Sequence, residues 1–270
     1  DLEPEVYNFR ILEAFIREAE RRGITNYPIH VKIDTGMHRL GFLPDQLPEL
    51  IEKLKSQKGL KVKSVFSHLA ASESWIFDNF TQKQIDALNA AHTEIEKKIE
   101  YPVWKHILNS AGIERFPDVQ CNMVRLGIGL YGVSASGLNG LKNVFTLKTT
   151  ILQIKEISNH ETVGYGRKEA LNRDAKIATI RIGYADGLDR KFGNRKGKVL
   201  INGNFAPIVG NVCMDLCMVD VTDIDAKEGD TVIIFGENLS VIELAESINT
   251  IPYEILTSVS PRVKRVYVKE

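Results

Sequence analysis

The feature that most constrains the fold of this chain is a change of sequence pattern near its middle. Up to residue 133, amphipathic segments with helical spacing alternate with short apolar runs, which is typical of βα units on a parallel sheet. The pattern predicts helices over residues 3–22, 45–55, 80–99 and 111–116, and strands over residues 29–33, 63–67, 106–108 and 121–125. Four strands are too few for a closed (β/α)8 barrel, which typically takes about 250 residues. The first half is therefore a small open sheet or one part of such a barrel.

A segment rich in Gly, Ser and Asn, residues 134–142, marks the boundary between the two patterns. Beyond it the pattern predicts one helix, over residues 241–248, and strands over residues 145–157, 176–182, 198–201, 205–209, 217–221, 231–235 and 262–268. Asn202-Gly203 is a typical hairpin turn. We therefore expect one domain over residues 1–142 and a mainly β domain over residues 143–270.

Composition narrows the possible partners. Lys and Arg together number 35, as do Asp and Glu, so the net charge is zero and nothing indicates a nucleic-acid partner. No apolar run reaches the roughly 18 residues of a membrane span, and the acidic start DLEPEVYNFR does not resemble a signal peptide. The cysteines, Cys121, Cys213 and Cys217, do not form a metal-binding pattern, so we expect reduced thiols, no metal and a cytoplasmic location.

Two motifs follow predicted strands of the first half. The run from Lys32 to Arg39 leaves the carboxyl end of a strand, where α/β folds bind ligands, and an arginine there could clamp a carboxylate. The alternative is a capped loop with a solvated Arg39. His68 ends the next strand and is either an acid–base group or a structural hydrogen-bonding residue.

Further motifs suggest a phosphate site and a presented tyrosine. Ser110 opens a helix within NSAG, and Gly127 and Gly129 would let backbone N–H groups approach a phosphate, although a plain helix cap explains NSAG equally well. Tyr165 lies between two glycines, as a presented base or as a strand aromatic covering glycine. Locally ambiguous positions, which turn chemistry alone could explain, are Tyr184, Asp186, Met214 and Asp215.

The order and spacing of these motifs resemble the alanine racemase family, which are fold-type III pyridoxal-phosphate enzymes. The strings that carry the resemblance are DTGMHRLGF, NSAG, VRLGIGLYG, VGYG, GYADG, PIVGNVCMD and PYEILTSVSPRVKRVY. The resemblance implies an α/β plus β fold class, an incomplete (β/α)8 TIM-type barrel followed by a mainly β C-terminal domain. Residues 1–142 would be the C-terminal portion of the cofactor-binding barrel.

The resemblance also implies roles for individual residues. Tyr165 would be the catalytic base on one face of the substrate α-carbon, presented to a partner subunit in a homodimer. Arg125 would face the pyridine nitrogen of pyridoxal 5'-phosphate, and His68 would link Arg125 towards Tyr165. The phosphate would be held by Ser110, Gly127, Ile128 and Tyr253. The substrate carboxylate would be bound by Arg39 and the backbone of Met214, with Lys32, a position often carbamylated in the family, orienting the arginine. The entry channel would be lined by Tyr184, Arg190 and Asp215.

The family's Schiff-base lysine lies in a VVKA-x-AYGHG-type segment, and nothing like it occurs in this sequence. Racemisation of L-alanine and D-alanine for peptidoglycan uses two bases, that lysine and the tyrosine. We therefore expect an isomerase whose lysine comes from the remainder of a longer racemase, or of a fusion with a cell-wall ligase, with residues 1–270 inactive alone. Missing barrel strands would also leave open sheet edges and exposed apolar faces, and hence poor solubility.

Two alternatives remain open. One is a lysine-free paralogue that binds pyridoxal phosphate or an amino acid without catalysis. The other is a racemase for serine or another small amino acid. Substrate preference would show at Asn211, where the family commonly has a basic residue, and at Glu73, where it commonly has Asp. Gly164, where Ser is frequent, is expected to matter little.

Overall fold

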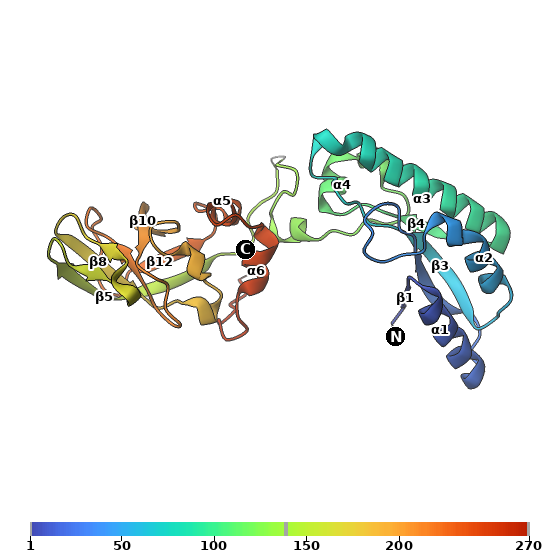
Figure 1. Ribbon diagram of the computed structural model, residues 1–270, viewed down its shortest axis with the longest axis horizontal. Coiled ribbons are helices and arrows are strands. Elements are labelled where there is room, and N and C mark those ends of the chain that lie inside the picture. Colours follow the sequence, from blue (N-terminus) through green and yellow to red (C-terminus); the bar gives the residue numbers. More distant parts are fainter. Residues whose placement is uncertain (1, 138–139, 269–270) are drawn as a thin grey trace. The chain divides into compact units, whose positions relative to one another are not determined.

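The computed structural model describes residues 2–137 and 140–268 (Figure 1). Its contacts divide the chain into two compact units, Asp1–Lys142 and Asn143–Glu270, here called unit 1 and unit 2. The predicted boundary segment, residues 134–142, includes positions 138 and 139, which lie outside the described residues.

Unit 1 is built on a sheet of four parallel strands in sequence order. The strands are β1 (Glu5–Val6), β2 (Tyr27–Lys32), β3 (Leu60–Phe66) and β4 (Trp104–His106). Parallel neighbours need crossover connections, and helices supply them: α1 (Phe9–Arg22), α2 (Leu47–Lys55) and α3 (Asp78–Ile99). The short α4 (Ser110–Arg115) follows β4.

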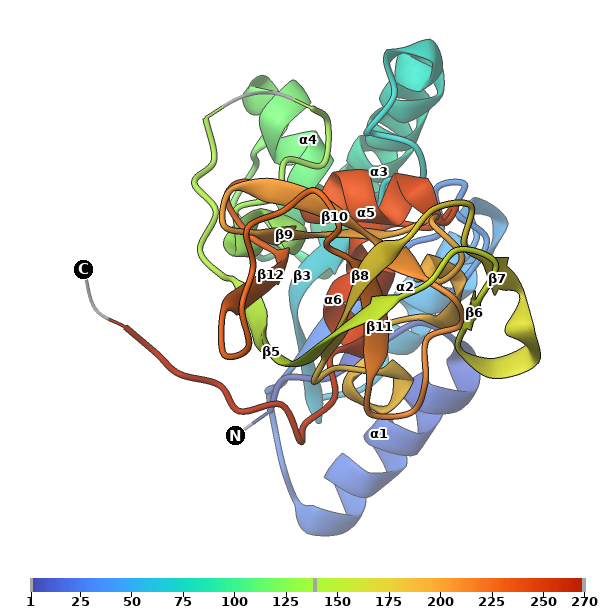
Figure 2. The ribbon, with the colours of Figure 1, turned by 90° about the vertical axis from the view of Figure 1, so that its left-hand side faces the viewer.

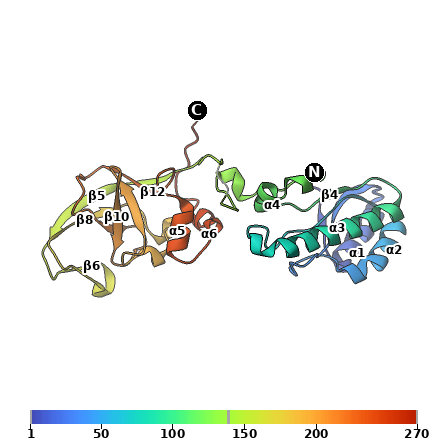
Figure 3. The same cartoon turned by 90° about the horizontal axis from the view of Figure 1, so that it is seen from above.

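The core of unit 1 lies between the sheet and its helices, which gather on one side of it (Figure 3). Side chains alternate along β2, so Ile29 and Val31 are fully buried in this core. His30 and Lys32 project to the other face of the sheet, where they meet charged and polar partners. The sheet therefore has one apolar and one polar face.

The start of one predicted helix of unit 1 and one predicted strand were wrong. The first helix begins at Phe9 rather than residue 3, because Asn8 caps it by accepting a hydrogen bond from the Ile11 N–H (2.9 Å). The residues before the cap form β1, which pairs with β2. The predicted strand at 121–125 is a turn and an irregular segment, in which Cys121 has a φ of 54° that no strand tolerates.

Unit 2 is a closed antiparallel barrel, strand order β10-β11-β8-β5-β12-β9 (Figure 2). Its strands are β5 (Leu147–Ile157), β8 (Ala175–Ile180), β9 (Lys198–Ile201), β10 (Asn204–Val209), β11 (Cys217–Asp220) and β12 (Thr231–Phe235). The predicted hairpin at Asn202-Gly203 joins β9 to β10, with both residues at positive φ. A second hairpin pairs β6 (Thr162–Val163) with β7 (Glu169–Ala170).

Two helices, α5 (Val241–Ser247) and α6 (Pro252–Ser258), complete unit 2. The sequence predicted α5 but missed α6, which starts at a proline in its first position. The strand predicted over residues 262–268 was wrong, since no ladder forms there among the described residues. Tyr267 is 90% exposed, so the alternating pattern of this segment has no neighbouring strand to pair with. No helix in residues 2–137 and 140–268 is both long and apolar enough to span a membrane.

Candidate active site

The predicted residues of unit 1 gather at the carboxyl edge of its parallel sheet. Arg125 is the centre of this group. Its Nη2 donates to the carbonyl oxygens of Ser67 (2.6 Å) and Ile107 (3.2 Å), which lie just beyond the ends of β3 and β4. Its Nη1 donates to Nδ1 of His106, and its Nη2 lies 3.5 Å from Nδ1 of His68. The guanidinium is therefore fixed by acceptors on two neighbouring strands.

The two histidines beside Arg125 are neutral. Burial, and then the positive charges of Arg125 and Arg39, lower the pKa of His68 to about 4. Burial and then Arg125 lower the pKa of His106 to about 3. Because a guanidinium can only donate, both rings accept at Nδ1 and carry their proton on Nε2. His68 thus has an N–H to offer a further partner.

The sequence interpretation missed His106, treating it only as a strand residue. It is the last residue of β4 and is 3% exposed, stacked on Phe66 with ring centroids 4.8 Å apart. A histidine ending a strand directly before the NSAG motif was the available signal, of the same kind that singled out His68. What the sequence did not contain was the register that turns its ring towards Arg125.

Ser110 and the glycine segment around Gly127, which were both predicted to bind a phosphate, contact each other. The Ser110 Oγ accepts hydrogen bonds from the backbone N–H groups of Gly127 (2.9 Å) and Gly129 (3.3 Å). Both glycines were predicted to approach a phosphate, and Ile128 between them is buried. The buried Ser110 hydroxyl accepts two hydrogen bonds. Among the described residues it has no acceptor for its own hydrogen. These residues fit a phosphate group, whose oxygens would accept that hydrogen.

The loop after β2 presents Arg39. Asp34 shapes it by accepting hydrogen bonds from the N–H groups of Gly36 (2.9 Å) and His38 (3.0 Å). Burial raises the pKa of Asp34, but these donors outweigh it, and the net shift is downward. Arg39 is exposed and has no hydrogen bond or ion pair among the described residues. Its charge is one of the causes that lower the pKa of His68.

Lys32 is buried on the polar face of the sheet, upstream of that loop. Its Nζ donates to Glu5 at 2.9 Å and lies 5.5 Å from the ring centroid of Phe66. It therefore already has a carboxylate partner, which the sequence interpretation did not anticipate.

Tyr165 lies on unit 2, in the loop between β6 and β7. Gly164 and Gly166 on either side have φ of 78° and 74°, a conformation that glycine adopts without strain. The tyrosine side chain is 73% exposed, and its backbone carbonyl accepts from Asn211 Nδ2 at 2.7 Å. The backbone of Tyr165 is therefore fixed by a hydrogen bond, while its phenol is free to contact a partner.

Two of the three predicted channel residues of unit 2, Tyr184 and Asp215, lie where two chain segments cross. The Tyr184 N–H donates to the carbonyl of Cys213 (2.9 Å), and a Cβ on Gly183 would lie 2.3 Å from the carbonyl oxygen of Met214. Only glycine permits this approach. Asp215 pairs with Arg262 Nη2 at 2.6 Å.

Arg262 was missed, because its segment was predicted to be a strand. It forms ion pairs with Asp186 through Nε (2.8 Å) and with Asp215, and so links the two segments that contain these aspartates. Arg190 is exposed on a 3-10 turn, Arg190–Phe192, and Tyr253 is 45% exposed on α6. The predicted residues therefore form two groups, one on each unit.

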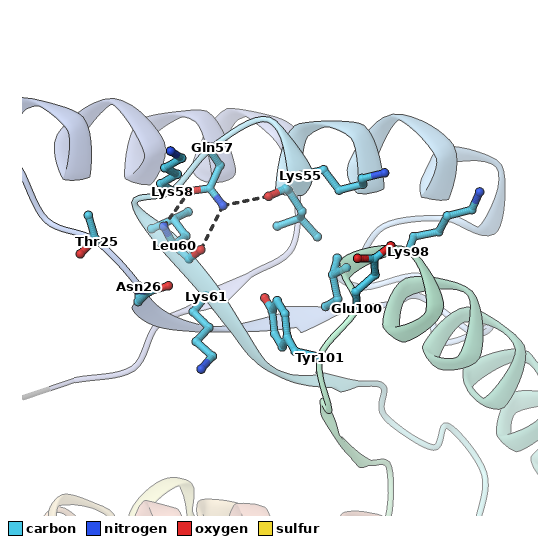
Figure 4. A pocket seen from close by; sticks show the side chains of 12 residues that line it. Thr25, Asn26, Lys55, Gln57, Lys58, Leu60, Lys61, Lys98, Glu100 and Tyr101 are labelled. Carbon is cyan, nitrogen blue, oxygen red and sulfur yellow. Dashed lines mark hydrogen bonds between the residues drawn. The ribbon is translucent and has the colours of Figure 1, made fainter.

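A cavity of about 690 Å³ lies at the opposite, amino-terminal edge of the unit 1 sheet. Four lysines line it, but they point in different directions (Figure 4): Lys55, Lys58, Lys61 and Lys98. Lys55 and Lys98 are in the last turns of α2 and α3, where lysines commonly offset the helix dipole. None of the predicted site residues lines this cavity. Among the residues that the structure describes, no cluster of His, Cys, Asp or Glu could hold a metal ion.

Comparison with known proteins gives a consistent result over both units. The family model of the alanine racemase N-terminal domain matches residues 1–135, and that of the alanine racemase C-terminal domain matches residues 144–267. An alanine racemase of Helicobacter pylori strain J99 is 39% identical over 284 residues, which cover 99% of this chain and 74% of the relative. Alanine racemase 1 of Clostridium acetobutylicum is 38% identical, covering 99% and 72%.

Solved structures agree. The alanine racemase of Bartonella henselae with covalently bound pyridoxal phosphate has a TM-score of 0.88 at 33% identity, covering 99% of this chain and 73% of that one. The alanine racemase of Clostridium difficile 630 has a TM-score of 0.89 at 35% identity, covering 99% and 71%. The predicted fold class, an incomplete (β/α)8 barrel followed by a mainly β domain, is confirmed.

Proposed function

The chain belongs to the alanine racemase family, and from that premise we propose how its residues contribute to the interconversion of L-alanine and D-alanine. The reaction and the cofactor, pyridoxal phosphate, follow from the family. A lysine-free binder without catalysis is not favoured, because relatives named alanine racemase match 99% of the chain. We propose further that the D-alanine serves peptidoglycan, and that the protein works in the cytoplasm as a homodimer.

The observation that carries the proposal is the fixed guanidinium of Arg125 between two neutral histidines. When bound, pyridoxal phosphate withdraws electrons from the substrate α-carbon and makes its proton acidic. Arg125 would face the ring nitrogen and, being protonated itself, would donate to that nitrogen rather than protonate it. This limits electron withdrawal, which favours racemisation over side reactions. Ser110, Gly127 and Ile128 would hold the phosphate, with Tyr253 of unit 2.

Tyr165 would move the proton on one face of the α-carbon. Its phenol is open on a glycine-flanked loop, so we propose that it serves the site of the partner subunit. His68 accepts from Arg125 at Nδ1 and would direct its Nε2–H towards the tyrosine oxygen. In this arrangement the charge of Arg125 and the Nε2–H of neutral His68 would both favour the ionised phenol, so that the tyrosine can act as a base.

The substrate carboxylate would be bound by Arg39, whose guanidinium has no partner among the described residues, and by the backbone of Met214. The channel would be lined by Tyr184, Arg190 and Asp215. We propose that Lys32 orients Arg39. A carbamate on Lys32 would be negatively charged beside Glu5, so carbamylation and the observed 2.9 Å ion pair exclude each other.

The second base stays a prediction. We propose that it is a lysine outside residues 1–270. The assignment of residues 1–142 to the cofactor-binding barrel and of residues 143–270 to the β domain is likewise our proposal.

The test is turnover of L-alanine and L-serine, with pyridoxal phosphate, by the protein that contains both residues 1–270 and the proposed lysine, here called the intact protein. We expect alanine to be racemised faster than serine, and Arg125→Lys to lower alanine turnover by about 100-fold, because lysine cannot make the paired contacts of the guanidinium. Arg173→Lys, at an exposed ion pair with Asp223, is the matched control. Faster turnover of serine would favour the alternative substrate, and full activity of Arg125→Lys would contradict the proposed role.

A further inference from the structure

A continuous row of hydrogen bonds runs from Arg125 across the polar face of the unit 1 sheet to Glu3. Beyond His106, whose Nδ1 contacts Arg125, the His106 Nε2 lies 3.0 Å from the Ser64 Oγ. The same oxygen lies 2.6 Å from Nδ1 of His30, and Nε2 of His30 lies 2.9 Å from a carboxylate oxygen of Glu3. We call these four residues, Glu3, His30, Ser64 and His106, the relay. Their contacts cross three strands and reach the chain segment before β1.

The two ends of the relay allow only one direction of donation. Arg125 can only donate, so Nδ1 of His106 accepts and the proton of His106 is on Nε2. Ser64 accepts a hydrogen bond from this N–H and, with His30 neutral, donates its own hydrogen to Nδ1 of His30. This leaves the His30 proton on Nε2, where it is donated to the carboxylate of Glu3, which only accepts. Every ring in the row thus has a fixed tautomer.

Burial makes these hydrogen bonds strong. Ser64 is fully buried and His106 is 3% exposed, so water does not compete for their polar atoms. The Nζ of Lys63 donates to the other oxygen of Glu3 at 2.6 Å, and the hydrogen bonds from Lys63 and then His30 lower the pKa of the Glu3 carboxyl. The acceptor at the end of the relay is therefore ionised at neutral pH.

We propose that Ser64, His30 and Glu3 are positioning residues for Arg125: they fix His106 in its Nε2–H form and thereby hold the guanidinium in one orientation. With the proton on Nδ1 instead, His106 would present a donor to a donor, and Arg125 would turn away from it. The inference rests on the proposed function, in which that orientation faces the cofactor ring. The role resembles that of partners which orient the ligands of a metal without touching the substrate.

The test combines histidine nitrogen NMR with kinetics on the intact protein. In the wild type we expect both His30 and His106 to be Nε2–H tautomers. Their NMR signals are assigned with variants that each replace one histidine. Ser64→Ala cuts the relay at its centre, and Glu3→Ala removes its acceptor at an exposed position, where substitutions usually change stability little. Both should give mixed tautomers at His106 and lower kcat about 10-fold, with less than about a twofold change in KM. Glu13→Ala, which removes a glutamate–lysine pair on the helical side of unit 1, should change neither readout.

An Nδ1–H tautomer of His106 in the wild type would overturn the inference. So would unchanged kcat in both variants, whatever their tautomers. Arg125→Lys, measured alongside, separates the two levels of the argument. Full turnover in Arg125→Lys overturns the role of Arg125 and this inference with it, whereas a loss there with full turnover in Ser64→Ala and Glu3→Ala overturns the inference alone.

Discussion

The two units manage the edges of their sheets in different ways. Unit 2 closes six of its strands into a barrel, so each of these six has a neighbour on both sides. Unit 1 has an open sheet with two edge strands, β1 and β4, of only two and three residues. Short edges leave little backbone for another chain to pair with. The barrel of unit 2 has no edge strands, and the sheet of unit 1 has short ones.

The face of the open sheet opposite the helices is also polar. We expected missing barrel strands to leave apolar faces uncovered, but this face carries ion pairs such as Lys63 with Glu3 and Lys32 with Glu5. The face opposite the helices would be the interior of the predicted barrel, where the proposed chemistry would take place. A sheet face with paired charges exposes less apolar surface when strands are missing than an apolar face would. Solubility of the 270-residue chain stays a prediction to be measured.

The sharpest way to test the independence of the two units is a matched pair of core substitutions. Ile29 in β2 and Ile180 in β8 are both fully buried strand residues, so Ile29→Ala and Ile180→Ala should each cost about 2–5 kcal/mol. Trp75 and Trp104, the two tryptophans of the chain, are both in unit 1. We expect Ile29→Ala to shift the urea midpoint seen by tryptophan fluorescence, and Ile180→Ala to shift only that seen by circular dichroism. One shared transition would contradict independent units.

Acid should distinguish the units by a smaller margin. The pKa values of His68 and His106, about 4 and about 3, lie below the unfolded value of about 6.5. Between these limits the unfolded chain binds protons that the folded chain does not, so stability present above pH 6.5 is lost as pH falls towards 4. In unit 2, burial raises the pKa of Asp220, but hydrogen bonds from Thr222 and Arg195 produce a net lowering, so its contribution is lost only below pH 3.8.

Urea unfolding between pH 7 and 4.5 measures this difference. The fluorescence midpoint of unit 1 should fall more steeply than the midpoint of unit 2, and His106→Gln should flatten the slope of unit 1. Parallel slopes for both units would count against the assignment of neutral histidines at the site.

The smallest expected effect compares two glycines in open space. Gly23 caps α1 in unit 1 with a φ of 63°, and Gly203 forms the β9–β10 turn of unit 2 with a φ of 80°. A Cβ at either position would meet nothing within 4 Å, so only backbone conformation opposes a side chain. We expect Gly23→Ala and Gly203→Ala to cost about 1 kcal/mol each in their own unit, and asparagine at either position to cost less. Stabilisation by alanine in a urea titration would show that the left-handed conformation is not kept.

The sequence predicted most of the fold because local patterns and tertiary pairing agree in it. Lys198–Ile201 and Thr231–Phe235 were predicted at their observed bounds, since each is a short apolar run between turn residues. Residues 121–125 and 262–268 were predicted wrongly because alternation indicates a strand only where a neighbour is available to pair with it. Such a neighbour cannot be read from the segment itself.

The candidate site was predictable where a motif contains its own chemistry, as with the glycines around Tyr165. Contacts between distant segments were not predictable. His106 and Arg262 were missed because their partners are brought to them by strand register and by a chain crossing. Glu3 lies 27 residues before His30 and 60 before Lys63, and no spacing rule connects them.

The central claim is that Tyr165 is the base on one face of the substrate α-carbon, and the most direct measurement is hydrogen exchange at that carbon. Tyr165→Phe in the intact protein is incubated in D2O with each alanine enantiomer, and the deuterium content and chirality of the alanine are followed. The account predicts that racemisation falls by about 100- to 10,000-fold, while exchange persists in one enantiomer and is lost in the other. Exchange of both enantiomers with racemisation at the wild-type rate would contradict it.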